Sequence, residues 1–199
     1  MSNRKADYPI HPQFTERWSP RAFSNEEISD ETLKTGFEAS RWAPSASNSQ
    51  PWRFMYSRRG TQTWDLFNSF LVEANRNWAT KASALVIILS KKDFKSGDKV
   101  AFSDSHSFDT GSAWMSFALE MNKLGWFTHG MAGIHHAQIK SEFKIPDNFT
   151  VEAMVAVGKL GDKTTLPDYL QTREEPNARK PVKSFVSEGS FPSDWLKTE

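Results

Sequence analysis

Residues 43–52 read APSASNSQPW, a run of small and amide side chains held between two prolines. Proline restricts the backbone, and short polar side chains offer hydrogen bonds without filling a core. A helix predicted over residues 30–42 precedes this segment, and a short strand predicted over residues 52–57 follows it. By composition, a binding loop and an ordinary turn between a helix and a strand are equally good interpretations.

Before that helix, residues 17–21 read Arg-Trp-Ser-Pro-Arg and place two guanidinium groups and a hydroxyl close together. In an extended backbone, positions 17, 19 and 21 project to the same side. Arginine suits phosphate because its forked donors keep their charge at every relevant pH. The segment therefore indicates either an anion site or a solvated turn with ordinary surface arginines.

Two apolar stretches predict central strands, because they lack the alternation of a half-exposed strand: residues 84–90 (ALVIILS) and 151–158 (VEAMVAVG). Residues 104–124 predict a helix with an apolar stripe so wide that both of its sides should be covered. The remaining expectations are a helix over residues 61–78, a charged surface connection over 91–99, a glycine-containing loop after 125, a short helix ending before Pro146 and a brief strand over 182–186.

The length of 199 residues, of which 38% are hydrophobic, favours one domain with an irregular arm before it. We expect an arm over residues 1–13 and a single domain over residues 14–199. Within that domain, residues 162–199 hold several prolines and no core of their own. We expect this extended tail to pack on a partner subunit.

Charge and composition exclude several classes of protein. Lys and Arg number 25 against 24 Asp and Glu, so the formal net charge of +1 does not favour nucleic acid as a partner. The absence of cysteine excludes disulfides and thiolate ligands. No stretch has the length of a membrane span or the pattern of a secretory signal, so we expect no membrane partner and a cytoplasmic location.

The histidines do not predict a metal site. His135 and His136 are adjacent rather than four positions apart, so they cannot form a ligand pair on one face of a helix. His129 is expected in an exposed loop, where contact with a substrate is the alternative. The sequence also shows no nucleophile elbow or triad pattern.

Taken together, the two polar segments resemble the nitroreductase family of flavin enzymes. Its members typically carry an Arg-x-Ser-x-Arg/Lys element and, one helix later, Ala-Pro-Ser-x-x-Asn-x-Gln-Pro-Trp, and both occur here nearly complete. The resemblance extends over residues 14–186 through a small-residue helix at 109–125, a turn at 130–134 (GMAGI), a strand ending at 157–158 and a basic tail at 177–181 (NARKP). It implies an α+β fold with a mixed, mostly antiparallel central sheet flanked by helices, in an intertwined homodimer.

The resemblance also implies which residues bind FMN. Arg17 and Ser19 would hold the phosphate and ribityl chain, and Arg179 would add a second cation there. Arg21 would face the pyrimidine edge of the flavin. The full cofactor-binding set comprises Arg17, Trp18, Ser19, Arg21, Pro44, Ser45, Asn48, Ala132, Gly133 and Arg179.

Within this set, Pro44, Ser45 and Asn48 would reach the flavin of the other subunit. A backbone N–H of Ala132 or Gly133 would bond flavin N5, and Asn75 is a looser candidate for the polar edge of the ring.

The implied activity is the reduction of nitroaromatics, quinones or related small-molecule acceptors by NAD(P)H in two alternating half-reactions, with FMN as the cofactor. It needs no catalytic side chain, because the protein supplies position and electrostatics. Arg21 would stabilise negative charge that develops on the flavin. The alternatives are a flavin carrier or sensor without turnover, and a family member with another task such as reductive dehalogenation or flavin fragmentation.

Overall fold

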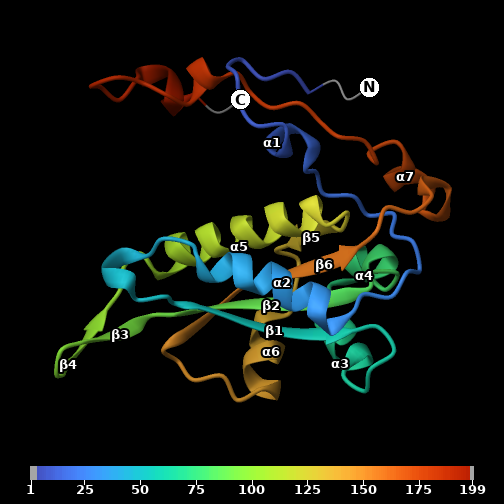
Figure 1. Cartoon of the computed structure of the whole chain (residues 1–199), viewed down its shortest axis with the longest axis horizontal. Helices are drawn as coiled ribbons and strands as arrows, with labels where there is room; N and C mark the ends of the chain where they lie inside the picture. Colours follow the sequence, from blue (N-terminus) through green and yellow to red (C-terminus); the bar gives the residue numbers. More distant parts are fainter. Residues whose placement is uncertain (1–3, 198–199) are drawn as a thin grey trace.

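A four-stranded sheet in the order β1-β2-β6-β5 forms the centre of the computed structural model, which describes residues 4–197 (Figure 1). The strands are β1 (Trp52–Arg58), β2 (Ala84–Lys91), β6 (Phe149–Gly158) and β5 (Phe127–Met131). Each neighbouring pair is antiparallel, which confirms the expected α+β fold with a mostly antiparallel sheet. Residues 1–3 of the predicted arm and 198–199 of the predicted tail lie outside the described residues.

The two strands predicted to be central, β2 and β6, occupy the middle of the sheet. Side chains of β2 alternate between two hydrophobic clusters, so that Leu85 and Ile87 face one side while Val86 and Ile88 face the other. Both faces of β2 are therefore covered, as the continuous apolar run indicates.

Helices α2 (Asp30–Arg41) and α5 (His106–Lys123) pack together on one face of the sheet (Figure 1). The predictions for both helices are confirmed within two residues at each end. Phe37 of α2 stacks on Phe117 of α5 with ring centroids 5.0 Å apart. Contrary to the expectation of cover on both sides, α5 leaves Phe108 and Met115 exposed in this chain.

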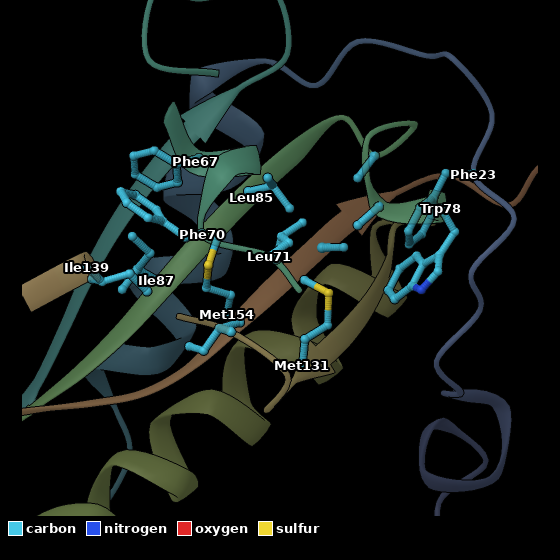
Figure 2. Close-up of a cluster of buried hydrophobic side chains, with 14 of the residues drawn as sticks. Phe23, Phe67, Phe70, Leu71, Trp78, Leu85, Ile87, Met131, Ile139 and Met154 are labelled. Atoms are coloured by element: carbon cyan, nitrogen blue, oxygen red, sulfur yellow. The ribbon is translucent and has the colours of Figure 1, made fainter. Parts of the chain in front are cut away.

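The other face carries α3 (Trp64–Ser69), α4 (Glu73–Ala79) and α6 (His136–Glu142). The prediction of one helix over residues 61–78 is wrong, because the segment forms two helices that are separated by residues 70–72. There Leu71 forms a bridge with Ile134, and Phe70 and Leu71 are fully buried. Figure 2 shows the cluster that these side chains join, and its burial outweighs the local preference for a continuous helix.

Three further expectations are corrected. The charged connection forms a hairpin of β3 (Asp93–Ser96) and β4 (Lys99–Phe102), whose turn contains Gly97 at φ 61°. The glycine-containing loop begins with β5, an edge strand paired to β6. The strand expected over residues 182–186 is instead a short 3₁₀ helix, Val182–Ser184.

The arm and the tail run beside each other, away from the sheet (Figure 1). The chain leaves the arm through a one-turn helix, α1 (Gln13–Glu16), and the tail contains α7 (Asp168–Gln171) and 3₁₀ turns at Lys163–Thr165 and Ser193–Leu196. Asp7 Oδ2 accepts a hydrogen bond from the Val182 N–H at 2.8 Å, which joins the two segments. Among residues 4–197, no helix is long and apolar enough to cross a bilayer.

Candidate functional site

A cavity of about 420 Å³ lies where the arm, α5, β5 and the tail meet. Arg17 and Ser19 line it from the segment after α1, and Arg179 lines it from the tail. The remaining lining residues are Phe14, Trp114, Met115, Ala118 and Gly130. The structure therefore brings together three of the predicted site residues from segments far apart in the sequence.

The charged side chains that line this cavity are both arginines. Arg17 Nη1 donates to Ser19 Oγ at 3.2 Å, so the two predicted ligands are held side by side. Burial lowers the pKa of Arg17, and the charges of Arg4 and Arg179 lower it further. We refer to Arg4, Arg17 and Arg179 as the arginine cluster. Its mutual repulsion makes the cavity a favourable place for an anion.

Arg21 lies outside the lining of the cavity and pairs with Glu174. One carboxylate oxygen of Glu174 accepts the backbone N–H groups of Arg21 and Ala22 at 2.6 and 2.7 Å. The other lies 3.8 Å from Arg21 Nη1, and the Glu174 side chain is only 2% exposed. Sequence reasoning missed Glu174, because nothing in the tail sequence points to a partner for Arg21.

Trp18 and His129 fix the same segment against β5. The Trp18 ring meets Phe127 edge to face with centroids 6.2 Å apart. His129 is a residue of β5 whose Nδ1 lies 3.0 Å from the Pro20 carbonyl oxygen and whose ring lies 4.6 Å from Trp78. The expectation of an exposed loop histidine is therefore wrong. Burial lowers the pKa of His129 to about 4, so its ring is neutral near pH 7.

The turn that follows β5 presents backbone donors. Ala132 is exposed, and within residues 4–197 neither its N–H nor that of Gly133 takes part in a hydrogen bond. Asn75 Nδ2 donates to the Gly133 carbonyl oxygen at 2.9 Å, so this amide holds the turn in place. A Cβ atom at Gly133 would lie 2.9 Å from the same Nδ2, so a larger residue there would displace the Asn75 amide.

Pro44, Ser45 and Asn48 lie beside the first turn of α5 and outside the lining of the cavity. The Ala46 N–H donates to Asp109 in the first turn of α5 at 3.1 Å, and Ser45 Oγ accepts from the Gln50 N–H at 3.0 Å. The nearest cavity residue on α5 is Trp114, five residues further along, which is about 7.5 Å along a helix axis, and none of Pro44, Ser45 and Asn48 lines the cavity. The structure therefore does not bring this loop to the cavity of its own chain.

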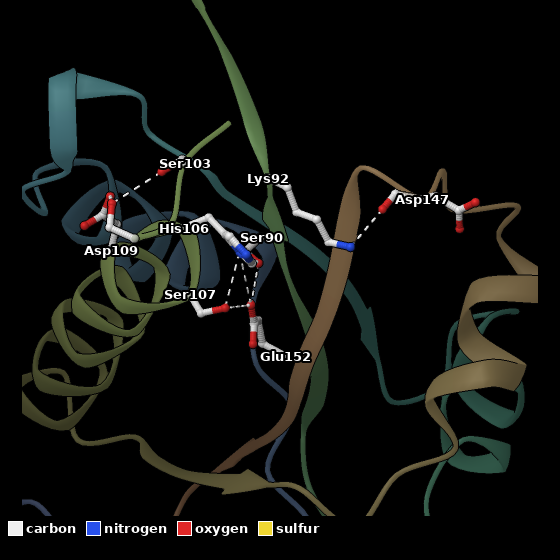
Figure 3. A network of polar contacts seen from close by, with 9 residues as sticks. Ser90, Lys92, Ser103, His106, Ser107, Asp109, Asp147 and Glu152 are labelled. Carbon is white, nitrogen blue, oxygen red and sulfur yellow. Dashed lines mark hydrogen bonds and ion pairs between the residues drawn. The ribbon is translucent and has the colours of Figure 1, made fainter. Parts of the chain in front are cut away.

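A serine, a histidine and a glutamate also meet at the far end of β2 (Figure 3). Ser90 Oγ lies 2.7 Å from His106 Nδ1 and donates to the Glu152 carboxylate, which also accepts from Ser107 Oγ at 2.6 Å. Ser90 is fully buried and bonded directly to the carboxylate. It is therefore not a nucleophile of the triad type, and the network joins α5 to the sheet.

Solved structures of other proteins share the fold of this chain. A solved structure described as an oxidoreductase containing FMN is 44% identical, covers 96% of this chain and 98% of its own, and has a TM-score of 0.93. A putative nitroreductase from Desulfovibrio desulfuricans, solved in complex with FMN, is 19% identical, covers 94% of this chain and 100% of its own with a TM-score of 0.71, and shows the fold alone.

A curated relative from Streptomyces coelicolor, named putative NADH dehydrogenase/NAD(P)H nitroreductase, is 25% identical over 162 residues. That match covers 73% of this chain and 80% of the relative. The model of the nitroreductase family matches residues 14–159, which include the segment of Arg17, the proline-bounded loop and the turn after β5. The cavity is thus built from the matched region and the tail, and the chain belongs to the nitroreductase family.

Proposed function

We propose that this protein is an FMN-dependent oxidoreductase that uses NAD(P)H to reduce small-molecule acceptors such as nitroaromatics and quinones. The observation that carries the proposal is the cavity in which Arg17, Ser19 and Arg179 converge beside α5 and β5. The 44% identical oxidoreductase is described as containing FMN, which supports the choice of cofactor.

The residues present fit the phosphate of FMN. Arg17 is half-buried, and its pKa is lowered by burial and by two neighbouring arginines. A phosphate dianion would offset this repulsion and accept charge-assisted hydrogen bonds from Arg17 and Arg179. Ser19 Oγ, already bonded to Arg17, can turn its own hydrogen toward the ligand.

Other groups would orient the flavin ring. Gly130 adds no side chain to the cavity wall, and the N–H groups of Ala132 and Gly133 are available as donors. When bound, FMN supplies two-electron chemistry, accepting hydride from a nicotinamide and passing electrons to an acceptor. Arg21, held by Glu174, would stabilise negative charge at the pyrimidine edge. No protein nucleophile is required.

We also propose that the protein works as a homodimer. The loop of Pro44, Ser45 and Asn48 is bonded to the first turn of α5 and lines no part of the cavity of its own chain, so a second copy would have to bring these residues to a bound flavin. Phe108 and Met115 of α5 are exposed in the single chain and would supply apolar surface for that contact.

The test is to load the purified protein with FMN and add NADH or NADPH without oxygen while recording the visible flavin spectrum. The proposal expects rapid loss of flavin absorption with at least one nucleotide, and its recovery when a quinone or nitroaromatic is added. A spectrum unchanged by both nucleotides would refute the enzyme and leave a flavin carrier.

Arg17→Ala tests the phosphate assignment separately. Loss of a charge-assisted contact worth about 1.5–3 kcal/mol should weaken FMN binding by roughly 10- to 150-fold. Arg41→Ala is the control, because Arg41 is exposed on α2 and pairs with Glu38. Equal FMN affinity in both variants would show that Arg17 does not hold the phosphate.

A further inference from the structure

We propose that Arg4 of the N-terminal arm is a positioning residue of the phosphate site. Its guanidinium group ties the segment that carries Arg17 to the tail that carries Arg179, so the arm holds the two ends of the site together. This inference rests on the proposed function, because it takes the phosphate of FMN as the ligand.

The hydrogen bonds of Arg4 link the segment of Arg17 to the tail. Arg4 Nη1 donates to the carbonyl oxygens of Thr15 at 3.1 Å and Arg17 at 2.5 Å. Its Nε donates to the carbonyl oxygen of Asn177 at 2.9 Å, two residues before Arg179. One planar group thus contacts both segments that supply cations to the cavity. A lysine ammonium lacks the separated donors of this fork.

The contact between the arm and the tail continues on the other side of Arg179. The Asp7 carboxylate accepts the Val182 N–H at 2.8 Å, and a groove of about 630 Å³ lies between the two segments. Figure 1 shows the arm and the tail side by side above α5. Arg179 is therefore placed between two points at which the arm holds the tail.

Electrostatics couples this placement to the ligand. Burial and the charge of Arg179 lower the pKa of Arg4, as burial and both neighbours do for Arg17. Bringing the arm to the cavity therefore gathers like charges in a partly buried place, which is costly without an anion. Phosphate would offset this cost, so binding of the phosphate and docking of the arm should favour each other. Riboflavin, which lacks the phosphate, should show no such coupling.

The experiment compares Arg4→Gln with Lys5→Gln, which makes the same charge change at the neighbouring position. Flavin is removed from each full-length protein, and the dissociation constants of FMN and riboflavin are measured by quenching of flavin fluorescence. We expect Arg4→Gln to weaken FMN binding about tenfold and riboflavin binding less than twofold, while Lys5→Gln changes neither. Arg4→Lys keeps the charge but not the fork, and should restore only part of the FMN affinity.

Three results would overturn the inference. Arg4→Gln could retain the FMN affinity of the parent, or it could lose FMN and riboflavin affinity equally, as a general structural defect would. Full recovery of the FMN affinity in Arg4→Lys would show that the positive charge is sufficient and that the hydrogen bonds of the guanidinium group to both segments are not needed.

Failure of the proposed function gives a different result. If the parent protein itself binds FMN no better than riboflavin, the phosphate site is absent and the cofactor assignment fails. If the parent prefers FMN and Arg4→Gln keeps that preference, only the role of Arg4 is refuted.

A second readout follows the tail itself. Trypsin cleavage after Arg179 and Lys183 should slow in the parent when FMN is added and remain unchanged when riboflavin is added. In Arg4→Gln the protection by FMN, supplied at a concentration that saturates the variant, should be weaker than in the parent, because the contact of Arg179 with the phosphate then holds the tail without the hydrogen bond from Arg4. Protection equal to that of the parent would contradict the positioning role of Arg4.

Discussion

Glu174→Gln should destabilise the protein although it changes a single charge in the tail. Glu174 is buried, and one of its oxygens accepts the N–H groups of both Arg21 and Ala22. Its other oxygen lies 3.8 Å from the Arg21 guanidinium and accepts no hydrogen bond within the described part of the chain. Glutamine can keep the first oxygen as an acceptor, but it places an uncharged NH₂ group, itself a donor, toward Arg21.

The magnitude follows from these contacts. A hydrogen bond to a charged group contributes about 1.5–3 kcal/mol, and a neutral one about 0.5–1.5 kcal/mol. Making both backbone bonds neutral therefore costs about 2–3 kcal/mol in the free energy of unfolding. For a chain of this size each kcal/mol lowers Tm by about 2–4 °C, so Tm should fall by about 4–12 °C.

Thermal unfolding of the flavin-free protein is the appropriate assay, since bound flavin would raise Tm by mass action. Glu175→Gln is the matched control. The Glu175 carboxylate is exposed, and it lies 3.7 Å from Lys163 in an ion pair at the surface. A surface pair contributes about 0–1 kcal/mol, so the control should lose at most a few degrees. Equal shifts in the two variants would refute the reasoning about the buried carboxylate.

Further predictions concern the packing of α2 and the titration of β5. Gly36→Ala puts a Cβ atom 2.8 Å from the Phe117 ring and should cost about 1–2 kcal/mol by calorimetry, whereas exposed Thr35→Ala should be near neutral. Ser29→Ala removes the side-chain cap of α2 and should cost about 1 kcal/mol in urea unfolding. The pKa of His129 falls from 6.5 to about 4 on folding, so the unfolded chain takes up the proton first as pH drops. Stability should fall by up to about 3 kcal/mol between those pH values, and His129→Gln should flatten this dependence in unfolding curves measured across that range.

The central elements could be predicted from the sequence because their signals are local. An unbroken apolar run has one simple explanation in a small α+β protein, and β2 ends within one residue of the prediction. The break between α3 and α4 had no such signal. It exists because Leu71 pairs with Ile134, and a residue 63 positions away leaves no mark on the local periodicity.

Edge structure was missed for a related reason. Five of the eight residues of β3 and β4 are exposed and three are charged, so their composition is that of a surface connection. What makes them strands is the turn at Gly97 and the backbone pairing across it. For residues 182–186 the composition favours a strand, but no neighbouring strand lies beside this segment in the described part of the chain, and Val182–Ser184 forms a 3₁₀ helix instead.

The residues of the candidate site also differ in whether a local sequence pattern indicates them. Arg17, Ser19 and Arg179 could be assigned by resemblance, because a motif records the groups that would touch a shared ligand. Glu174 could not be, because it acts on the backbone of Arg21, from which it is separated by 153 positions. Arg4 is separated from Asn177 by 173 positions, and the acceptors that link it to the two segments of the site are carbonyl oxygens, which every residue offers. Side chains that hold a backbone in place leave no residue pattern at their target, so the support of this site becomes visible only in the folded chain.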